Sequence, residues 1–214
     1  MSISTPTILA LAAAYFTGAI PFGLIVSRAR GVDIRKVGSG NIGATNVFRC
    51  VGKPWGILVF ALDMLKGWAP AAWFPALAIA ATGSDSPAPA FLSLACGVAA
   101  VAGHNWPVYL GFKGGKGVAT TTGILLGVSP AAMGIGLAAW VLVFVTARYV
   151  SVASMAAAVV VAASAWWLHP QPPPVIPATF TLLAVFVLWR HKSNVQRLRA
   201  GTESRFQFGK KRNG

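Results

Sequence analysis

The sequence predicts an all-α integral membrane protein, and its composition, apolar stretches and charge distribution lead to this prediction. The chain of 214 residues is 56% hydrophobic and only 10% charged, with a mean hydropathy of +0.66. This composition excludes an ordinary soluble domain of the same length. The apolar residues gather in stretches close to the roughly 20 residues that a membrane-spanning helix needs, and no strand periodicity is present.

Several apolar stretches are candidates for spanning helices: 7–27, 55–81, 90–110, 118–146, 150–168 and 174–189. The first has no Lys or Arg, so it lacks the basic region of a cleaved signal peptide and is expected to be a retained helix. The 118–146 stretch contains Ser129-Pro130, and proline ends a helix unless it opens the next one. We therefore expect a short span at 118–128, an outside turn, and a returning span at 131–146.

The basic residues predict the orientation of these helices. Of 18 Lys and Arg residues, six lie in 28–54 and eight in 190–214, whereas the turns at 82–89 and 169–177 contain none. By the positive-inside rule the basic segments face the cytoplasm and the N-terminus faces outside. An outside start and a cytoplasmic end require an odd number of spans. We expect seven, with five as the alternative.

The chain is expected to form a single polytopic domain over 1–214, with a basic cytoplasmic tail at 190–214, because no linker or internal repeat divides it. Basic residues beside the spans attract lipid headgroups, so the expected partner is the lipid bilayer and not nucleic acid. Cys50 and Cys96 are not expected to pair, and the chain has only four carboxylates. This argues against a carboxylate-bound metal site, and we expect no metal and no cofactor.

A glycine-lysine block, G103-H-N-W-P-V-Y-L-G-F-K-G-G-K-G-V-A-T120, is the first motif that indicates chemistry. Gly114, Gly115 and Gly117 are expected to leave backbone N–H groups uncovered, and Lys116 adds a positive charge. Such a concave set of donors suits an anion. A cytoplasmic loop with turn glycines is the alternative interpretation.

A second block of similar character, G38-S-G-N-I-G-A-T-N-V-F-R49, lies upstream. Arg49 can hold two phosphate oxygens with its planar fork. Neutral donors are supplied by Ser39, Asn41, Thr45 and Asn46, although these residue types also cap helices. The block matches the G-x-G-x-x-G pattern of dinucleotide folds, but no strand precedes it, so nucleotide binding is not indicated. Two such loops imply two anionic groups handled at one membrane face.

Two further pairs of polar residues lie at the spans. Asp63 and Lys66 are three residues apart inside an apolar span, which favours an internal ion pair over substrate contact. His191 and Asn194 have the same spacing at the end of the last span, so they can present two polar groups to one site. Arg148, Ser151 and Ser154 are expected on that face.

His104 is the remaining polar candidate, and a structural role and a functional role are equally compatible with its position. The sequence after it is N-W-P-V-Y, so after four intervening residues position 109 holds Tyr and not an acid. The H-x4-D signature known from acyltransferases is therefore absent.

Together these segments resemble the bacterial acyl-phosphate:glycerol-3-phosphate acyltransferase family, usually called PlsY. The resemblance covers essentially the whole chain and rests on the two blocks above and on H191-K-S-N-V-Q-R-L-R-A-G-T-E203. It implies transfer of a fatty acyl group from acyl phosphate to the 1-hydroxyl of sn-glycerol 3-phosphate, giving lysophosphatidic acid and phosphate. It also implies a bacterial inner membrane location, an active site facing the cytoplasm, and functional coupling to the enzyme that makes acyl phosphate.

The motifs and the resemblance together give the candidate residues and their expected roles. Catalytic candidates are Ser39, Arg49, Lys116, His191 and Asn194. Substrate-binding candidates are Gly40, Asn41, Thr45, Asn46, His104, Gly114, Gly115, Gly117 and Ser154, with Ser151 the less certain of the two serines. Structural roles are expected for Asp63, Lys66 and Glu203.

Acyl phosphate is an activated mixed anhydride, so direct attack by the glycerol hydroxyl needs only positioning and stabilisation of negative charge. Either the bound phosphate or a side chain can accept the proton of the attacking hydroxyl. A phosphate-ester transporter is a rival interpretation, but transporters place their sites at the midplane of repeated halves. A structural membrane subunit is a third interpretation, but it does not explain Ser39 or the 114–117 glycines.

Overall fold

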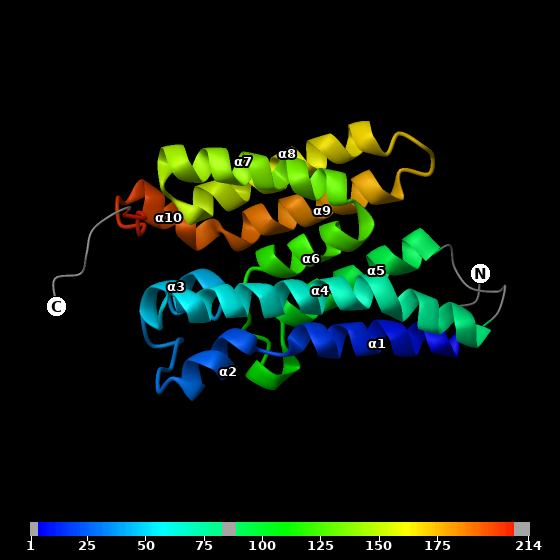
Figure 1. Ribbon diagram of the computed structural model, residues 1–214, viewed down its shortest axis with the longest axis horizontal. Helices are drawn as coiled ribbons and strands as arrows, with labels where there is room; N and C mark the ends of the chain where they lie inside the picture. Colours follow the sequence, from blue (N-terminus) through cyan, green and yellow to red (C-terminus); the bar gives the residue numbers. More distant parts are fainter. Residues whose placement is uncertain (1–3, 83–88, 208–214) are drawn as a thin grey trace. The chain divides into compact units, whose positions relative to one another are not determined.

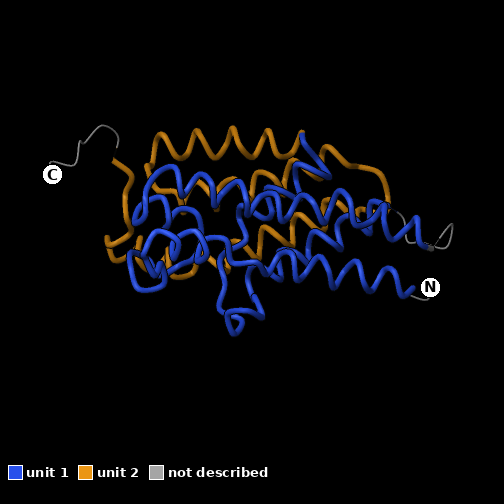
Figure 2. The backbone as a smooth tube through the Cα atoms, turned by 60° about the horizontal axis from the view of Figure 1, so that its bottom comes forward, with its two compact units in different colours: residues 1–130 blue, residues 131–214 orange. Residues whose placement is uncertain are grey.

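The computed structural model describes residues 4–82 and 89–207, and all regular structure in these ranges is helical (Figure 1). The helices are α1 (Thr5–Ala19), α2 (Phe22–Ala29), α3 (Ala44–Cys50), α4 (Lys53–Thr82), α5 (Pro89–Asn105), η2 (Val108–Leu110), α6 (Val118–Val128), α7 (Pro130–Ala147), α8 (Val150–Leu168), α9 (Val175–Arg190) and α10 (Lys192–Arg199). The chain divides into two compact units, residues 1–130 and 131–214 (Figure 2). Asp85 and most of the predicted 82–89 turn lie outside the described residues.

In the first unit, α4 lies against α1, α3, α5 and α6. Glycines allow these helices to approach closely. Added Cβ atoms at Gly18 and Gly103 would overlap the backbones of α5 and α1, and Cβ atoms at Gly67 and Gly123 would overlap the backbones of α6 and α4. Small residues at helix contacts are the usual basis of packing in a bilayer, where no hydrophobic force drives helices together. The two glycine pairs thus fix α1 on α5 and α4 on α6.

In the second unit, α8 packs on α9, and Gly136 of α7 faces Val161 of α8 with no room for a larger side chain. The segment after α10 folds back onto this unit. The Phe206 N–H donates to the Arg148 carbonyl at 2.7 Å, and the Phe206 ring lies edge-on to Phe144, with centroids 5.1 Å apart. The start of the tail is therefore a packed segment.

The expected helix break near Ser129-Pro130 is present, because α6 ends at Val128 and Pro130 opens α7. A second break, which the sequence analysis did not predict, divides the first apolar stretch at Ile20 and Pro21, between α1 and α2. Pro21 has no N–H to donate to the Thr17 carbonyl, so it cannot continue α1. The Ile20 carbonyl accepts the Phe22 N–H at 3.1 Å, at the start of α2.

By length and composition, five helical segments of the described chain can cross a membrane: Thr5–Ala29, Lys53–Ala81, Pro89–Leu110, Pro130–Ala147 and Val150–Leu168. The α9–α10 pair, bent by 48°, adds a sixth if it counts as one span. α6 has 11 residues and rises about 16 Å, about half of the hydrocarbon core. The all-helical class with several spans is confirmed, whereas seven spans stay a prediction.

Candidate active site

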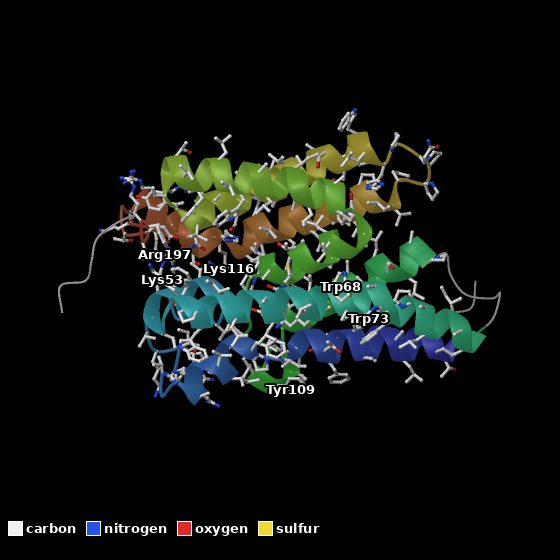
Figure 3. The ribbon with its side chains drawn as sticks, viewed as in Figure 1. Lys53, Trp68, Trp73, Tyr109, Lys116 and Arg197 are labelled. Carbon is white, nitrogen blue, oxygen red and sulfur yellow. The ribbon has the colours of Figure 1, made fainter. Side chains whose placement is uncertain are left out.

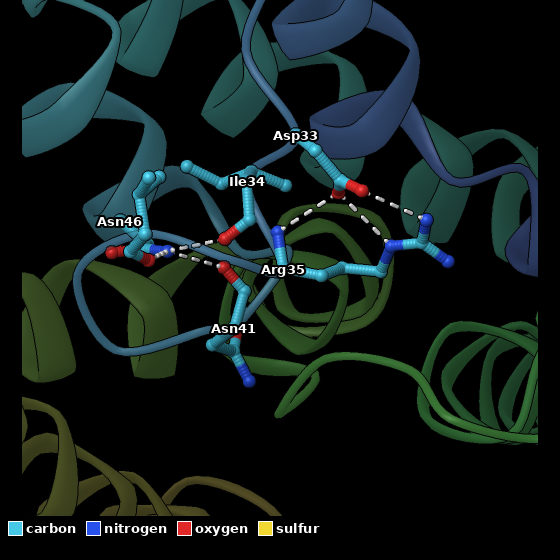
Figure 4. A network of polar contacts seen from close by, with 6 residues as sticks. Asp33, Ile34, Arg35, Asn41 and Asn46 are labelled. Carbon is cyan, nitrogen blue, oxygen red and sulfur yellow. Dashed lines mark hydrogen bonds and ion pairs between the residues drawn. The ribbon is translucent and has the colours of Figure 1, made fainter.

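The first block folds into a loop organised by one side chain, Asn46 of α3 (Figure 4). Its amide nitrogen donates to the carbonyls of Ile34, Val37 and Asn41 at 3.2, 3.1 and 2.9 Å. Its amide oxygen accepts the Ser39 N–H at 3.0 Å. The Asn46 amide, which the sequence offered as a donor to a substrate, is thus engaged by the loop itself, and Asn46 is 4% exposed. The structure gives Asn46 a loop-shaping position.

The turns on either side of Ser39 require glycine, since Gly38 and Gly40 have φ of 57° and 70°. Asn41 continues the turn by accepting the Gly43 N–H at 2.8 Å, immediately before α3 begins. Ser39 and Thr45 are exposed. The Ser39 side chain is therefore exposed, while its backbone is held in place by the hydrogen bond from the Ser39 N–H to Asn46.

Arg49 lies in the last turn of α3 and is half-buried. Arg35, the other arginine of this region, has its fork occupied by Asp33: Nε lies 3.1 Å from Oδ1 and one terminal nitrogen 3.2 Å from Oδ2 (Figure 4). The hydrogen bonds from Arg35 hold the pKa of Asp33 below its ordinary value. The two arginines thus differ in their surroundings, which supplies a matched pair for mutagenesis.

The second block closes onto the end of α5, and here the sequence expectation was wrong in one respect. The Gly114 and Gly115 N–H groups are not left uncovered: they donate to the carbonyls of Asn105 and His104 at 3.2 and 3.1 Å. Each backbone donor in a chain must find an acceptor when it is buried, and the last carbonyls of α5 are the nearest ones. Gly114 and Gly115 therefore dock the loop on α5.

Close packing is the second reason for these glycines. A Cβ at Gly115 would overlap the His104 imidazole, and one at Gly114 would overlap the His104 carbonyl. Gly117 has φ of 81° and directly precedes α6. The N–H groups in the first turn of a helix have no intrahelical acceptor and attract anions. Lys116, half-buried on the segment leading into α6, adds its charge there (Figure 3).

The predicted Asp63–Lys66 ion pair is present and includes a third residue. Lys66 Nζ lies 2.8 Å from Asp63 Oδ1 and also donates to the Ile20 carbonyl at 2.7 Å, at the break between α1 and α2. His104 Nδ1 lies 3.8 Å from the same carboxylate oxygen. All three side chains are at most 5% exposed. The structure thus joins the ion pair to the histidine under the glycine loop.

In the second unit, Glu203 joins the segment after α10 to both α8 and α10. Its Oε1 accepts hydrogen bonds from Ser151 Oγ of α8 and Asn194 Nδ2 of α10, both at 2.7 Å, and its Oε2 pairs with Arg197 Nε at 2.7 Å. Burial raises the pKa of Glu203, but these hydrogen bonds and the Arg197 charge outweigh it, so the pKa lies below its ordinary value. Glu203 is therefore ionised at neutral pH and fixes the Asn194 amide.

His191 and Ser154 are also buried in this unit. His191 Nδ1 lies 2.8 Å from the Val187 carbonyl, which can only accept, so Nδ1 carries the proton. Whenever the ring is neutral, its lone pair is therefore on Nε2. Ser154 Oγ accepts the Trp140 indole N–H at 3.2 Å. Of the two serines, Ser151 is the one joined to Asn194 through Glu203.

The structure thus brings together two sets of candidates in the first unit and one in the second. Around Asn46 lie Ser39 and Asn41, around His104 lie Asp63, Lys66, Gly114 and Gly115, and around Glu203 lie Ser151 and Asn194. Two of their partners, Asn105 and Arg197, were not predicted from the sequence. In residues 4–82 and 89–207, no three His, Cys, Asp or Glu side chains are grouped as a metal ion would require.

Comparison with known proteins agrees with the blocks on which the site is built. Residues 8–201 match the glycerol-3-phosphate acyltransferase family. Proteins named glycerol-3-phosphate acyltransferase from Aquifex aeolicus and Geobacter metallireducens are 42% and 46% identical, over 90% and 94% of this chain and 95% and 97% of theirs.

Solved structures agree as well. The crystal structure of PlsY, an integral membrane glycerol 3-phosphate acyltransferase, in its glycerol 3-phosphate form is 39% identical, with a TM-score of 0.82 over 94% of this chain and 96% of that one. Its lysophosphatidic acid form is 38% identical, with a TM-score of 0.79 over 94% and 95%. On this match in sequence, length and fold, the chain belongs to the glycerol-3-phosphate acyltransferase family.

Proposed function

We propose that this protein transfers a fatty acyl group from acyl phosphate to the 1-hydroxyl of sn-glycerol 3-phosphate, giving lysophosphatidic acid and inorganic phosphate. One observation carries the proposal: two related solved structures, at 38–39% identity over 94% of this chain, are a glycerol 3-phosphate form and a lysophosphatidic acid form. These molecules are the acceptor and the product of the same acyl transfer. The family gives the enzyme class, and the acyl donor is inferred from the residues available for catalysis.

The nature of the available groups favours acyl phosphate as the donor. The sequence after His104 lacks the H-x4-D pair that would activate a hydroxyl against a thioester. In an acyl phosphate the carbonyl carbon is already activated: the glycerol oxygen bonds to it, the bond to the phosphate oxygen breaks, and phosphate leaves. Such a step needs orientation and stabilisation of developing negative charge, which cations and N–H donors provide.

We assign roles to the residues on this basis. In the first unit, Arg49, Lys116 and Ser39 stabilise the anionic groups, Gly40, Asn41 and Thr45 complete the first loop, and Asn46 acts through the shape of that loop. The 114–117 glycines and His104 form the binding site for glycerol 3-phosphate. The N–H groups of the first turn of α6 are the backbone donors to its phosphate. In the second unit, His191 and Asn194 orient hydroxyl groups, Ser154 contributes to binding, and Glu203 holds Asn194.

The donor assignment is tested with purified protein and three donors. Acyl phosphate with labelled glycerol 3-phosphate is expected to give labelled lysophosphatidic acid and one equivalent of phosphate. The same acyl chain on coenzyme A or on acyl-carrier protein is expected to give no product above the rate without enzyme. Comparable turnover with either thioester would contradict the donor assignment while leaving the family intact.

We further propose a multi-pass protein of the bacterial inner membrane with seven spans, an outside N-terminus and its active site facing the cytoplasm, coupled to the enzyme that makes acyl phosphate. Both blocks of the first unit carry cations, which favours a cytoplasmic location for them. The acyl chain would reach the site from the bilayer.

Cysteine labelling tests this topology, because α6 must cross for the α6–α7 turn to lie outside. Ser129 is buried, so the exposed Ala131 is the better position. In a variant with Cys50 and Cys96 replaced by alanine, A131C and Q171C are expected to react with an impermeant maleimide in right-side-out vesicles. R35C should react only in inverted ones. An A131C protein that reacts only in inverted vesicles, or in neither, would favour five spans.

A further inference from the structure

The buried cluster of Lys66, Asp63 and His104 calls for an explanation beyond helix packing. An ion pair at membrane depth is expensive, and replacing a buried ion pair by apolar residues is often neutral or stabilising in proteins. Stability alone therefore does not explain a carboxylate that is 2% exposed beside a lysine that is 5% exposed. Its surroundings indicate a second task.

The cluster forms a chain of contacts that begins at the α1–α2 break and ends at the glycine loop. Lys66 donates to the Ile20 carbonyl and pairs with Asp63, and Asp63 Oδ1 lies 3.8 Å from His104 Nδ1. At 3.8 Å the two atoms are too far apart for a hydrogen bond, but the buried negative charge on the Nδ1 side of the imidazole favours the ring orientation that turns Nδ1 toward it. The other edge of the His104 ring, with Nε2, then faces Gly115.

The glycine loop rests on this ring. The His104 carbonyl accepts the Gly115 N–H at 3.1 Å, and the imidazole fills the space where a Gly115 side chain would lie. A change in the tilt of the ring must therefore move Gly115 or the adjacent Lys116. In a packed interior such shifts are transmitted, because no free volume absorbs them.

We propose that Asp63 is a positioning residue that sets the glycerol-3-phosphate-binding loop through His104. Asp63 does not touch the substrate: it fixes the imidazole, and the imidazole fixes Gly115 and Lys116. Lys66 neutralises the carboxylate and joins the α1–α2 break to the same cluster. The proposal rests on the proposed function in one respect, namely that the 114–117 loop binds glycerol 3-phosphate.

The test compares two double variants that both remove the Lys66 charge. Asp63→Leu/Lys66→Met removes the oxygen atoms that lie beside His104 Nδ1, whereas Asp63→Asn/Lys66→Met keeps a polar amide oxygen at that position. We expect the leucine variant to keep its melting temperature in detergent and to raise the KM for glycerol 3-phosphate on the order of tenfold. The KM for acyl phosphate should change less than about twofold, and the asparagine variant should remain close to the wild type.

A His104→Gln background tests the route of the effect. If Asp63 acts through His104, the leucine and methionine substitutions should change the KM for glycerol 3-phosphate less than about twofold there. Three results would overturn the proposal: an unchanged KM in the leucine variant, equal defects in the leucine and asparagine variants, or a full effect in the His104→Gln background. A leucine variant that is recovered only unfolded, beside a folded asparagine variant, would assign the polar side chain at position 63 to folding and would overturn it too.

Calorimetric binding of glycerol 3-phosphate without a donor separates this proposal from the function itself. Wild-type protein that binds glycerol 3-phosphate but transfers no acyl group would contradict the proposed reaction. The difference in dissociation constant between the leucine and asparagine variants would still measure positioning.

Discussion

Replacing Gly115 with alanine is expected to raise the KM for glycerol 3-phosphate by roughly tenfold or more, with a much smaller effect on kcat. The reason is steric: the new methyl group would overlap the His104 imidazole. Overpacking at a site without free volume typically costs about 1–3 kcal/mol, and each 1.4 kcal/mol is about tenfold in an equilibrium constant. The loop relieves this strain by lifting from α5, which moves Lys116 away from the bound phosphate.

Gly134→Ala is the matched control for this substitution. Gly134 lies within α7, and an added Cβ would meet no atom within 4 Å. Initial rates at varied glycerol 3-phosphate and saturating acyl phosphate give both constants for each variant. An unchanged KM in Gly115→Ala, with Gly134→Ala also unchanged, would contradict the packing of the glycine loop on His104.

Replacing Arg49 with lysine is expected to act chiefly on kcat. Lysine keeps the charge but loses the planar fork that binds two phosphate oxygens at once. If the fork acts in the transition state, its loss raises the barrier by about 1–3 kcal/mol, which is roughly 5- to 150-fold in kcat. Single-turnover measurements would show whether the chemical step is the one that slows.

Arg35→Lys provides the comparison on the same loop. The Arg35 fork already binds Asp33 at the surface, and exposed ion pairs contribute little to stability. Its kcat should stay close to the wild-type value. Near-normal kcat in Arg49→Lys, in protein shown to be inserted and monodisperse, would exclude a transition-state role for the fork.

The sequence predicted those features that depend on local composition. Apolar stretches marked the spans, and Pro130 marked the break that separates α6 from α7. The break at Pro21 was missed because the flanking apolar residues hide a single proline in a hydropathy profile. α3 and α10 were missed because they have 7 and 8 residues, too few for a hydropathy signal.

Candidate site residues were predictable in kind but not in their partners. The i, i+3 spacing was enough to predict the Asp63–Lys66 pair. It could not show that His104, 41 residues after Asp63 in the chain, lies beside the same oxygen. Nor could the glycine pattern show that the Gly114 and Gly115 N–H groups are used by α5, because the acceptor of a backbone donor is decided by tertiary packing. In the same way, the sequence could not show that Ser151 and not Ser154 donates a hydrogen bond to Glu203, because Glu203 lies 52 residues after Ser151.

The Asn46 network has a consequence for the order in which the protein is built. The Asn46 side chain reaches its carbonyl acceptors at Asn41 and Ile34 across only 5 and 12 residues. Closing such short loops costs little entropy and takes well under a microsecond. The Glu203–Ser151 bond, in contrast, spans 52 residues and requires α8, α9 and α10 to be in place. During synthesis, therefore, the Asn46 hydrogen bonds of the loop that carries Ser39 can form as soon as α3 has been made, whereas the Asn194 amide is fixed only after residue 203 has been made.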